Sequence, residues 1–110
     1  MKRPMPGIAT GLLVVGLSTT AIANGSPGPD WAETYFRQGG NDAPACGACH
    51  AMAAAETSGQ VGPDLDVLQP DRAKLRAALR DGVGVMPSFA QALSEAQIKA
   101  MADYVAEAVE

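Results

Sequence analysis

Apolar residues recur at helical spacing in three parts of the chain, and the C-terminal part has the strongest signal. Ser94 and Gln97 form a capping box there, and Leu93 with Ile98 forms the matching hydrophobic staple. The apolar positions that share one face after this cap are Ile98, Met101, Ala102, Val105 and Val109. The pattern predicts a terminal helix that begins after Ser94.

Two further helices are bounded by caps and by glycines. The first is expected over residues 30–38, with its first residue as N-cap, Glu33 at the capping-box position and Gly39 after its end. The second is expected over residues 71–81, with the aspartate at its start as N-cap and Gly82 after its end.

The remaining segments show neither helical nor strand periodicity. Residues 46–55 are mostly small and allow one short helix, and residues 57–63 are expected to form an irregular loop. Residues 83–90 contain Gly84 and Pro87 and cannot be a regular helix throughout. No alternation of apolar and polar residues is long enough to predict a sheet, and no internal repeat is found. The pattern predicts an all-α domain of three to four helices with long loops.

The N-terminal segment has the features of an export signal. Lys2 and Arg3 form a basic start, residues 8–17 are apolar and uncharged, and Ala21-Ile22-Ala23 provides the small residues that a signal peptidase recognises. The apolar run is shorter than the roughly 20 residues that span a bilayer, which argues against an uncleaved membrane anchor. We predict a periplasmic protein with a signal peptide over residues 1–23, a flexible leader over 24–29 and one domain over 30–110.

The charge balance is acidic and excludes some classes of partner. Eight Lys and Arg stand against 12 Asp and Glu, which gives a net charge of −4 at pH 7. The predicted cleavage removes Lys2 and Arg3 and makes the domain more acidic still. An acidic domain is a poor binder of nucleic acid or of anionic lipid. Small domains often depend on a cofactor, a metal or disulfides for stability, which directs attention to the two cysteines.

The segment Cys46-Gly47-Ala48-Cys49-His50 contains the candidate chemistry. Two thiols separated by two residues can add to the two vinyl groups of one haem, and the adjacent histidine then reaches the iron from the same side. We therefore predict one haem c, covalently bound through Cys46 and Cys49, with His50 as an axial ligand of the iron.

Three other interpretations of the two cysteines were weighed. A thioredoxin-like redox pair is expected in a βαβ setting, which the helical pattern does not provide. A structural zinc site usually needs four Cys or His ligands, and the chain has only two Cys and one His. A plain disulfide between Cys46 and Cys49 remains an alternative, although it gives the neighbouring histidine no role.

The second axial position of the iron needs a ligand from elsewhere in the chain, because there is no second histidine. Methionine is a common ligand at this position. Met52 lies too close to His50 in sequence, and Met101 belongs to the apolar face of the last helix. Met86 lies in a non-helical segment far from the attachment motif, and Pro87 stiffens the backbone after it. Met86 is therefore the predicted second ligand.

In these motifs and in their order, the sequence resembles the class I c-type cytochromes, particularly the small bacterial periplasmic members with one haem. The matching parts are the haem motif at 46–50, Gly62-Pro63-Asp64-Leu65, and Met86-Pro87-Ser88-Phe89 before a terminal helix with Tyr104. The resemblance implies a cytochrome c fold, with three to four helices and long loops wrapped around one covalent haem.

The resemblance also implies roles for residues outside the attachment motif. The carbonyl of Pro63 would accept a hydrogen bond from Nδ1 of His50, which orients the ring and leaves Nε2 for iron. The first and last helices would cross through Phe36 or Tyr35, with Ala32, against Tyr104.

The function that the resemblance implies is electron transfer without catalysis. The protein would shuttle single electrons between redox proteins, such as a dehydrogenase and a terminal oxidase or reductase, as a monomer or weak dimer that is not embedded in the membrane. Two alternatives stay open: a cytochrome c subunit of a larger periplasmic dehydrogenase complex, and a haem sensor that binds a gas when Met86 dissociates.

Three arginines at helical spacing, Arg72, Arg76 and Arg80, form a basic stripe in this acidic protein. A docking patch for an acidic partner is one interpretation. The favoured interpretation is a solvated helix face, because exposed charges are usual on small helical proteins.

Overall fold

The computed structural model describes Pro4, Gly7, Gly11, Gly16 and residues 27–110. The predicted cleavage after Ala23 and the leader residues 24–26 lie outside the described residues. No helix in this described part is both long and apolar enough to cross a membrane.

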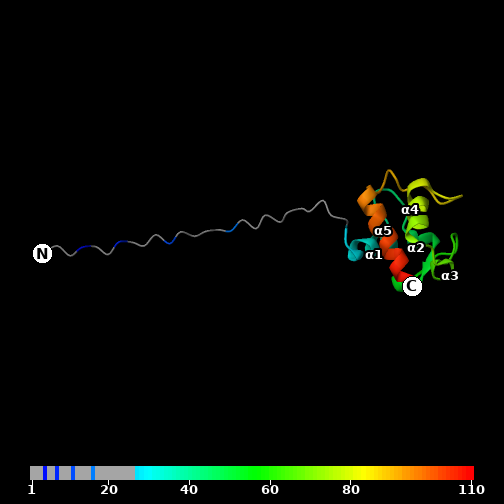
Figure 1. Ribbon diagram of the computed structural model, residues 1–110, viewed down its shortest axis with the longest axis horizontal. Helices are drawn as coiled ribbons and strands as arrows, with labels where there is room; N and C mark the ends of the chain where they lie inside the picture. The colour runs from blue at the N-terminus through cyan, green and yellow to red at the C-terminus, as the bar shows by residue number, and fades with distance from the viewer. Residues whose placement is uncertain (1–3, 5–6, 8–10, 12–15, 17–26) are drawn as a thin grey trace.

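The described chain is mostly helical and contains one small hairpin (Figure 1). Its elements in chain order are α1 (Pro29–Gln38), α2 (Cys46–Cys49), β1 (Ala51–Met52), η1 (Ala53–Ala55), β2 (Thr57–Ser58), α3 (Leu65–Leu68), α4 (Arg72–Asp81) and α5 (Glu95–Ala108). The three long helices are those that the apolar pattern predicts. The other two α-helices, α2 and α3, are single turns of four residues each.

Two sequence-based expectations for the N-terminal half are wrong. The N-cap of α1 is Gly28 rather than Asp30, because Pro29 occupies the first helical position, where its missing N–H is not needed. Residues 51–58, for which the pattern predicts no strand, form a hairpin in which Ala51 pairs with Ser58 and Met52 with Thr57. The domain is therefore not strictly all-α.

The core lies where α5 packs against α1 and α4 (Figure 1). Phe36 of α1 meets Tyr104 of α5 edge-on, with ring centroids 6.2 Å apart, and Ala32 is fully buried beside this crossing. All five apolar positions predicted on one face of α5 are buried. The capping box of Ser94 and Gln97 is present in both of its hydrogen bonds.

Two segments of the chain begin and close alike although no sequence repeat predicts it, and they differ at the tip, where Asn41 and Asp42 both have positive φ in one and Gly84 alone in the other. We call residues 39–45 the attachment turn, which comes after α1, and residues 82–88 the methionine turn, which comes after α4. Each begins with a glycine at positive φ, Gly39 at +69° and Gly82 at +74°. Each then forms an antiparallel bridge, Gly40 with Ala43 in the first and Val83 with Met86 in the second. A proline comes directly after each bridge.

Candidate functional site

The attachment turn leads directly into the helix that holds both cysteines. Cys46 and Cys49 stand one helical turn apart in α2, so their side chains share a face of that helix. His50 leaves the helix in an extended conformation, and its backbone N–H still bonds to the carbonyl of Cys46 at 2.9 Å. Both thiols are free and partly exposed. The motif thus places two thiols and one imidazole side by side.

The hairpin and the chain after it form hydrogen bonds to the backbone of this motif. Thr57 Oγ1 donates to the carbonyl of His50 at 3.0 Å, and the N–H of Gly62 donates to the carbonyl of Cys49 at 2.7 Å. Both bonds hold backbone rather than side chains. The thiols and the imidazole ring remain free to meet a ligand.

The ring of His50 is held in one orientation by the segment that the family resemblance singles out. Its Nδ1 lies 2.7 Å from the carbonyl oxygen of Pro63. A carbonyl can only accept, so Nδ1 carries the proton and Nε2 keeps a free lone pair for a metal. Gly62 lies against the ring, and a Cβ there would collide with His50 Cε1. Any larger residue at position 62 would displace the ring.

The cysteines and His50 line an apolar cleft of about 780 Å³. The larger apolar side chains in its wall are Phe36, Val61, Leu65, Leu68, Leu75, Leu79, Val83, Val85 and Phe89. Val61 and Val85 are 70% and 87% exposed, an arrangement that is unfavourable in water unless something covers it. The donor set and the apolar wall fit a large, flat, apolar cofactor that is attached through two thiols.

Met86 lines the same cleft as His50 and is half-buried. Among the other methionines in the described part of the chain, Met52 is fully buried in the core and does not line the cleft. Met101 lines it from α5 but is only 1% exposed and belongs to the core. The structure therefore brings Cys46, Cys49, His50, Pro63 and Met86 to one cleft, and adds Met101 as a neighbour that sequence reasoning placed in the core alone.

The environment of the thiols argues against a thioredoxin-like redox pair and against a structural zinc site. Burial raises the pKa of the Cys46 thiol to about 11, whereas a redox-active thiol pair needs a lowered pKa to form its thiolate. Within the described residues, no group of three or more His, Cys, Asp and Glu side chains is placed to hold a metal ion. A zinc site built on the cysteines therefore has no further ligands in this part of the chain.

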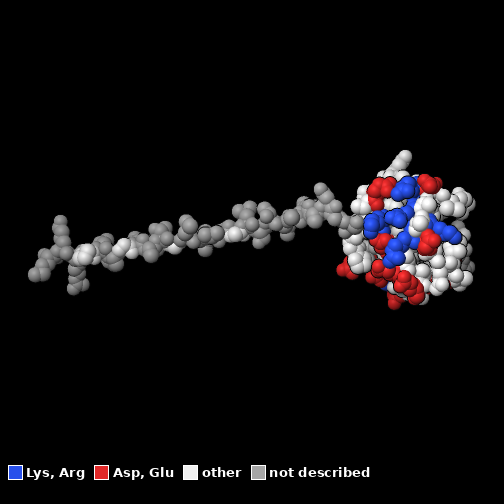
Figure 2. All heavy atoms as spheres, in the orientation of Figure 1, with Lys and Arg blue, Asp and Glu red and all other residues white. Residues whose placement is uncertain are grey.

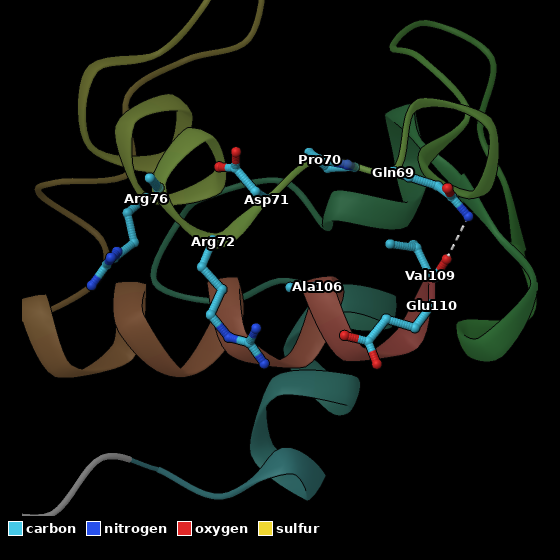
Figure 3. Close-up of a pocket in the computed structure, with 9 residues that line it drawn as sticks. Gln69, Pro70, Asp71, Arg72, Arg76, Ala106, Val109 and Glu110 are labelled. Atoms are coloured by element: carbon cyan, nitrogen blue, oxygen red, sulfur yellow. Dashed lines mark hydrogen bonds between the residues drawn. The ribbon is translucent and has the colours of Figure 1, made fainter.

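A second hollow of about 710 Å³ lies between the start of α4 and the end of α5 (Figure 3). Gln69 crosses one side of it and donates from Nε2 to the carbonyl of Val109 at 2.9 Å. Arg72 extends from α4 towards α5, where it pairs with Asp103 and Glu107. The hollow has no cysteine, histidine or methionine in its wall, so it does not offer the set of ligands that holds a c-type haem.

Two of the three arginines in the basic stripe on α4 form ion pairs within the protein. Figure 2 shows Lys and Arg side chains gathered over α4 and α5, with acidic side chains beside them. Arg72 pairs with two carboxylates of α5, and Arg80 pairs with Glu95 at 2.8 Å. These contacts agree with the solvated-face interpretation rather than with a patch that awaits an acidic partner.

Two comparisons with known proteins gave a match. A family model described as cytochrome c oxidase, cbb3-type, subunit III matches residues 30–105. Among solved structures, the c-type cytochrome SorU from Sinorhizobium meliloti is similar, with a TM-score of 0.67 and 34% sequence identity. That similarity covers 74% of this chain and 90% of SorU. A third comparison, with curated proteins, gave no match.

Proposed function

The chain belongs to the class I c-type cytochromes, within the family described as cytochrome c oxidase, cbb3-type, subunit III, and from that premise we propose the details of its site and role. Proteins of this class carry covalently bound haem c and transfer electrons. In this chain, Cys46 and Cys49 attach one haem, and His50 with Met86 are its axial ligands. The protein passes single electrons between redox proteins in the periplasm.

The observation that supports this proposal best is the orientation of His50. The Pro63 carbonyl fixes the proton on Nδ1, which leaves Nε2 for iron on a ring that lines the same cleft as the cysteines and Met86. One apolar cleft is lined by two free thiols, an imidazole with an unprotonated Nε2 and a thioether. These are the groups that a c-type haem with His and Met ligands requires.

The residues of the chain perform separate tasks in electron transfer. Bound haem supplies an iron that gains and loses one electron. Cys46 and Cys49 keep the cofactor from dissociating, which matters outside the cytoplasm. His50 is held rigid by Pro63, and the apolar wall of the cleft excludes water, so that little has to move when the charge of the site changes. With Met86 as the second ligand, no axial position remains open for oxygen or peroxide.

Partners approach at the mouth of the cleft, near the attachment motif and the methionine turn. Ala48 and Val85 are exposed there, and neither has a charge that must be desolvated on contact. Electron-transfer complexes are usually small and short-lived, which suits a surface of short side chains.

A second candidate function is that of a haem-bearing subunit in a larger oxidoreductase. The description of the matching family names an oxidase subunit, and Val67, which does not line the cleft, is 81% exposed on α3. Gel filtration of a native extract separates the two roles. Elution at the size of the monomer supports the shuttle, whereas stable co-elution with a dehydrogenase or oxidase supports the subunit.

The decisive experiment is spectroscopy and mass measurement of the protein purified from cells that assemble c-type cytochromes. We expect the mass of one porphyrin added to the polypeptide and, in the oxidised form, the weak absorption band of a sulfur-to-iron bond. Met86→Ala is expected to abolish that band with the haem still attached. The control is Met101→Leu, which conserves volume and is expected to keep the band.

Each possible result of this experiment bears on a different part of the proposal. Absence of added porphyrin mass would overturn haem attachment altogether. A band that survives in Met86→Ala and disappears in Met101→Leu would transfer the ligand role to Met101.

A further inference from the structure

The last residue of the methionine turn and the residue after it form hydrogen bonds to the end of α4. The N–H of Phe89 donates to the carbonyl of Leu79 at 2.7 Å. The hydroxyl of Ser88 donates to the carbonyl of Arg80 at 2.5 Å and accepts from the N–H of Ala90 at 3.2 Å. Ser88 therefore ties the residues just after Met86 back to a carbonyl near the end of α4, where the last carbonyls have no partner within the helix.

The same end of α4 is tied to the start of α5 through the side chain of Arg80. Its guanidinium donates two hydrogen bonds to the carboxylate of Glu95, at 3.2 Å from Nε and 2.8 Å from the terminal nitrogen. The Arg80 fork beside Glu95 lowers the pKa of that carboxyl, so the pair stays charged over the neutral range. The backbone of Arg80 holds Ser88 while its side chain holds α5.

The attachment turn has no equivalent of this arrangement. The residue that occupies the position of Ser88 there is Ala45, which has no hydroxyl. That turn does not need one, because Cys46 comes directly after it and is the proposed covalent attachment point. The methionine turn has no covalent attachment point of this kind, and in the proposed site a single sulfur-to-iron bond would link it to the haem.

We propose that Ser88 is a positioning residue for the iron–Met86 bond, and that Arg80 supports it by joining the end of α4 to α5. The inference rests on the proposed function, since it assumes that Met86 is the second ligand. Ser88 does not touch the iron. It lowers the free energy of the closed arrangement, in which Met86 faces the cleft, relative to an open arrangement in which the turn has moved away.

The binding of an added ligand measures this closed-to-open equilibrium directly. Imidazole can reach the ferric iron only when Met86 has left it, so the apparent affinity rises with the population of the open arrangement. The two hydrogen bonds of Ser88 stabilise only the closed arrangement. A variant that lacks them therefore favours the open arrangement by the free energy that the bonds contribute. The bonds are solvent-accessible, which places the effect at the lower end of the usual range, about threefold.

The test compares Ser88→Ala with Ser88→Thr in the oxidised holoprotein, by titration with imidazole at fixed pH. Ser88→Ala is expected to bind imidazole about threefold more tightly than the natural protein. Ser88→Thr keeps the hydroxyl and is expected to restore the natural affinity. The sulfur-to-iron band, recorded without imidazole, is expected in both variants.

Arg80→Gln and Arg72→Gln provide a matched pair for the second half of the proposal. Both arginines join α4 to carboxylates of α5, but Arg72 does so at the end of α4 that is remote from Met86. Arg80→Gln is expected to increase the affinity for imidazole, whereas Arg72→Gln is expected to leave it unchanged. Equal affinities in all four variants and in the natural protein, with the sulfur-to-iron band present, would overturn the positioning role and leave Met86 ligation standing. Absence of that band from the natural protein would instead overturn the proposed function.

Discussion

The attachment turn and the methionine turn begin and close alike but lead into different segments of the chain. Both begin with a glycine whose φ and ψ are accessible almost only to glycine, and both close an antiparallel bridge before a proline. The attachment turn continues into α2 and its two cysteines. The methionine turn contains its candidate ligand within the bridge, at Met86, and continues to Phe89 in the core.

The difference shows two ways of placing a ligand with turns that begin and close alike. The attachment turn has only to deliver Cys46, since covalent bonds then hold the haem whatever the turn does. The methionine turn has to hold its ligand by conformation, through the Phe89 and Ser88 hydrogen bonds to α4. The same substitution in each turn should therefore have unequal effects on the bond between Met86 and the iron.

The largest expected effect comes from removing the two cysteines to which the haem is proposed to be attached. In the double variant Cys46→Ala and Cys49→Ala, we expect complete loss of haem that survives extraction with acidified organic solvent. Met86→Ala, by contrast, is expected to keep all of its haem through the same extraction. The measurement is porphyrin absorbance in the protein and solvent fractions. Retention of haem by the double variant would show that the two turns do not differ in the way proposed.

A smaller effect is expected from matched alanine substitutions at the glycines that begin the two turns. A Cβ at Gly39 would lie 2.7 Å from the carbonyl oxygen of Ala43, and one at Gly82 would lie 2.7 Å from that of Met86. Both glycines also have positive φ, so each substitution should lower the free energy of unfolding by about 1–3 kcal/mol. Denaturant unfolding of the holoprotein measures that loss.

The sulfur-to-iron band should differ between these two variants although similar stabilities are expected for them. Gly82→Ala displaces the residue that contains the ligand, so we expect a weakened sulfur-to-iron band. Gly39→Ala displaces the approach to a covalently held cysteine, so its band should match that of the natural protein. If both variants lost the band to the same degree, the attachment turn would have to influence Met86 as strongly as the methionine turn does.

Most of the site could be predicted from the sequence because its residues lie in short, ordered motifs. The spacing of Cys46, Cys49 and His50 specifies their chemistry directly, and the three long helices have caps or glycines at their ends. The hydrogen bond between His50 and Pro63 was implied by the family resemblance, and the structure places the two atoms 2.7 Å apart.

The features that escaped prediction are too short or too dependent on contacts to leave a sequence pattern. Each strand of the hairpin has two residues, which cannot show an alternation of apolar and polar positions. The single turn α3 is capped by Asp64 but has no helical periodicity of its own. The likeness of the two turns lies in the backbone and retains only a glycine and a proline in common, so no repeat search could detect it.

The smallest expected effect concerns the one side-chain hydrogen bond that joins the attachment turn to the segment after the methionine turn. Asn41 Nδ2 donates to the carbonyl of Ala92 at 3.0 Å. Asn41→Asp keeps a residue type that tolerates positive φ but removes the donor, and should lower the free energy of unfolding by about 0.5 kcal/mol. Asp42→Asn is the control, since Asp42 also has positive φ and the exchange is the reverse one. Denaturant unfolding of both variants tests whether the attachment turn is coupled to the segment after the methionine turn: a loss of stability in Asn41→Asp alone indicates that it is, whereas equal stabilities would mean that this hydrogen bond does not stabilise the fold.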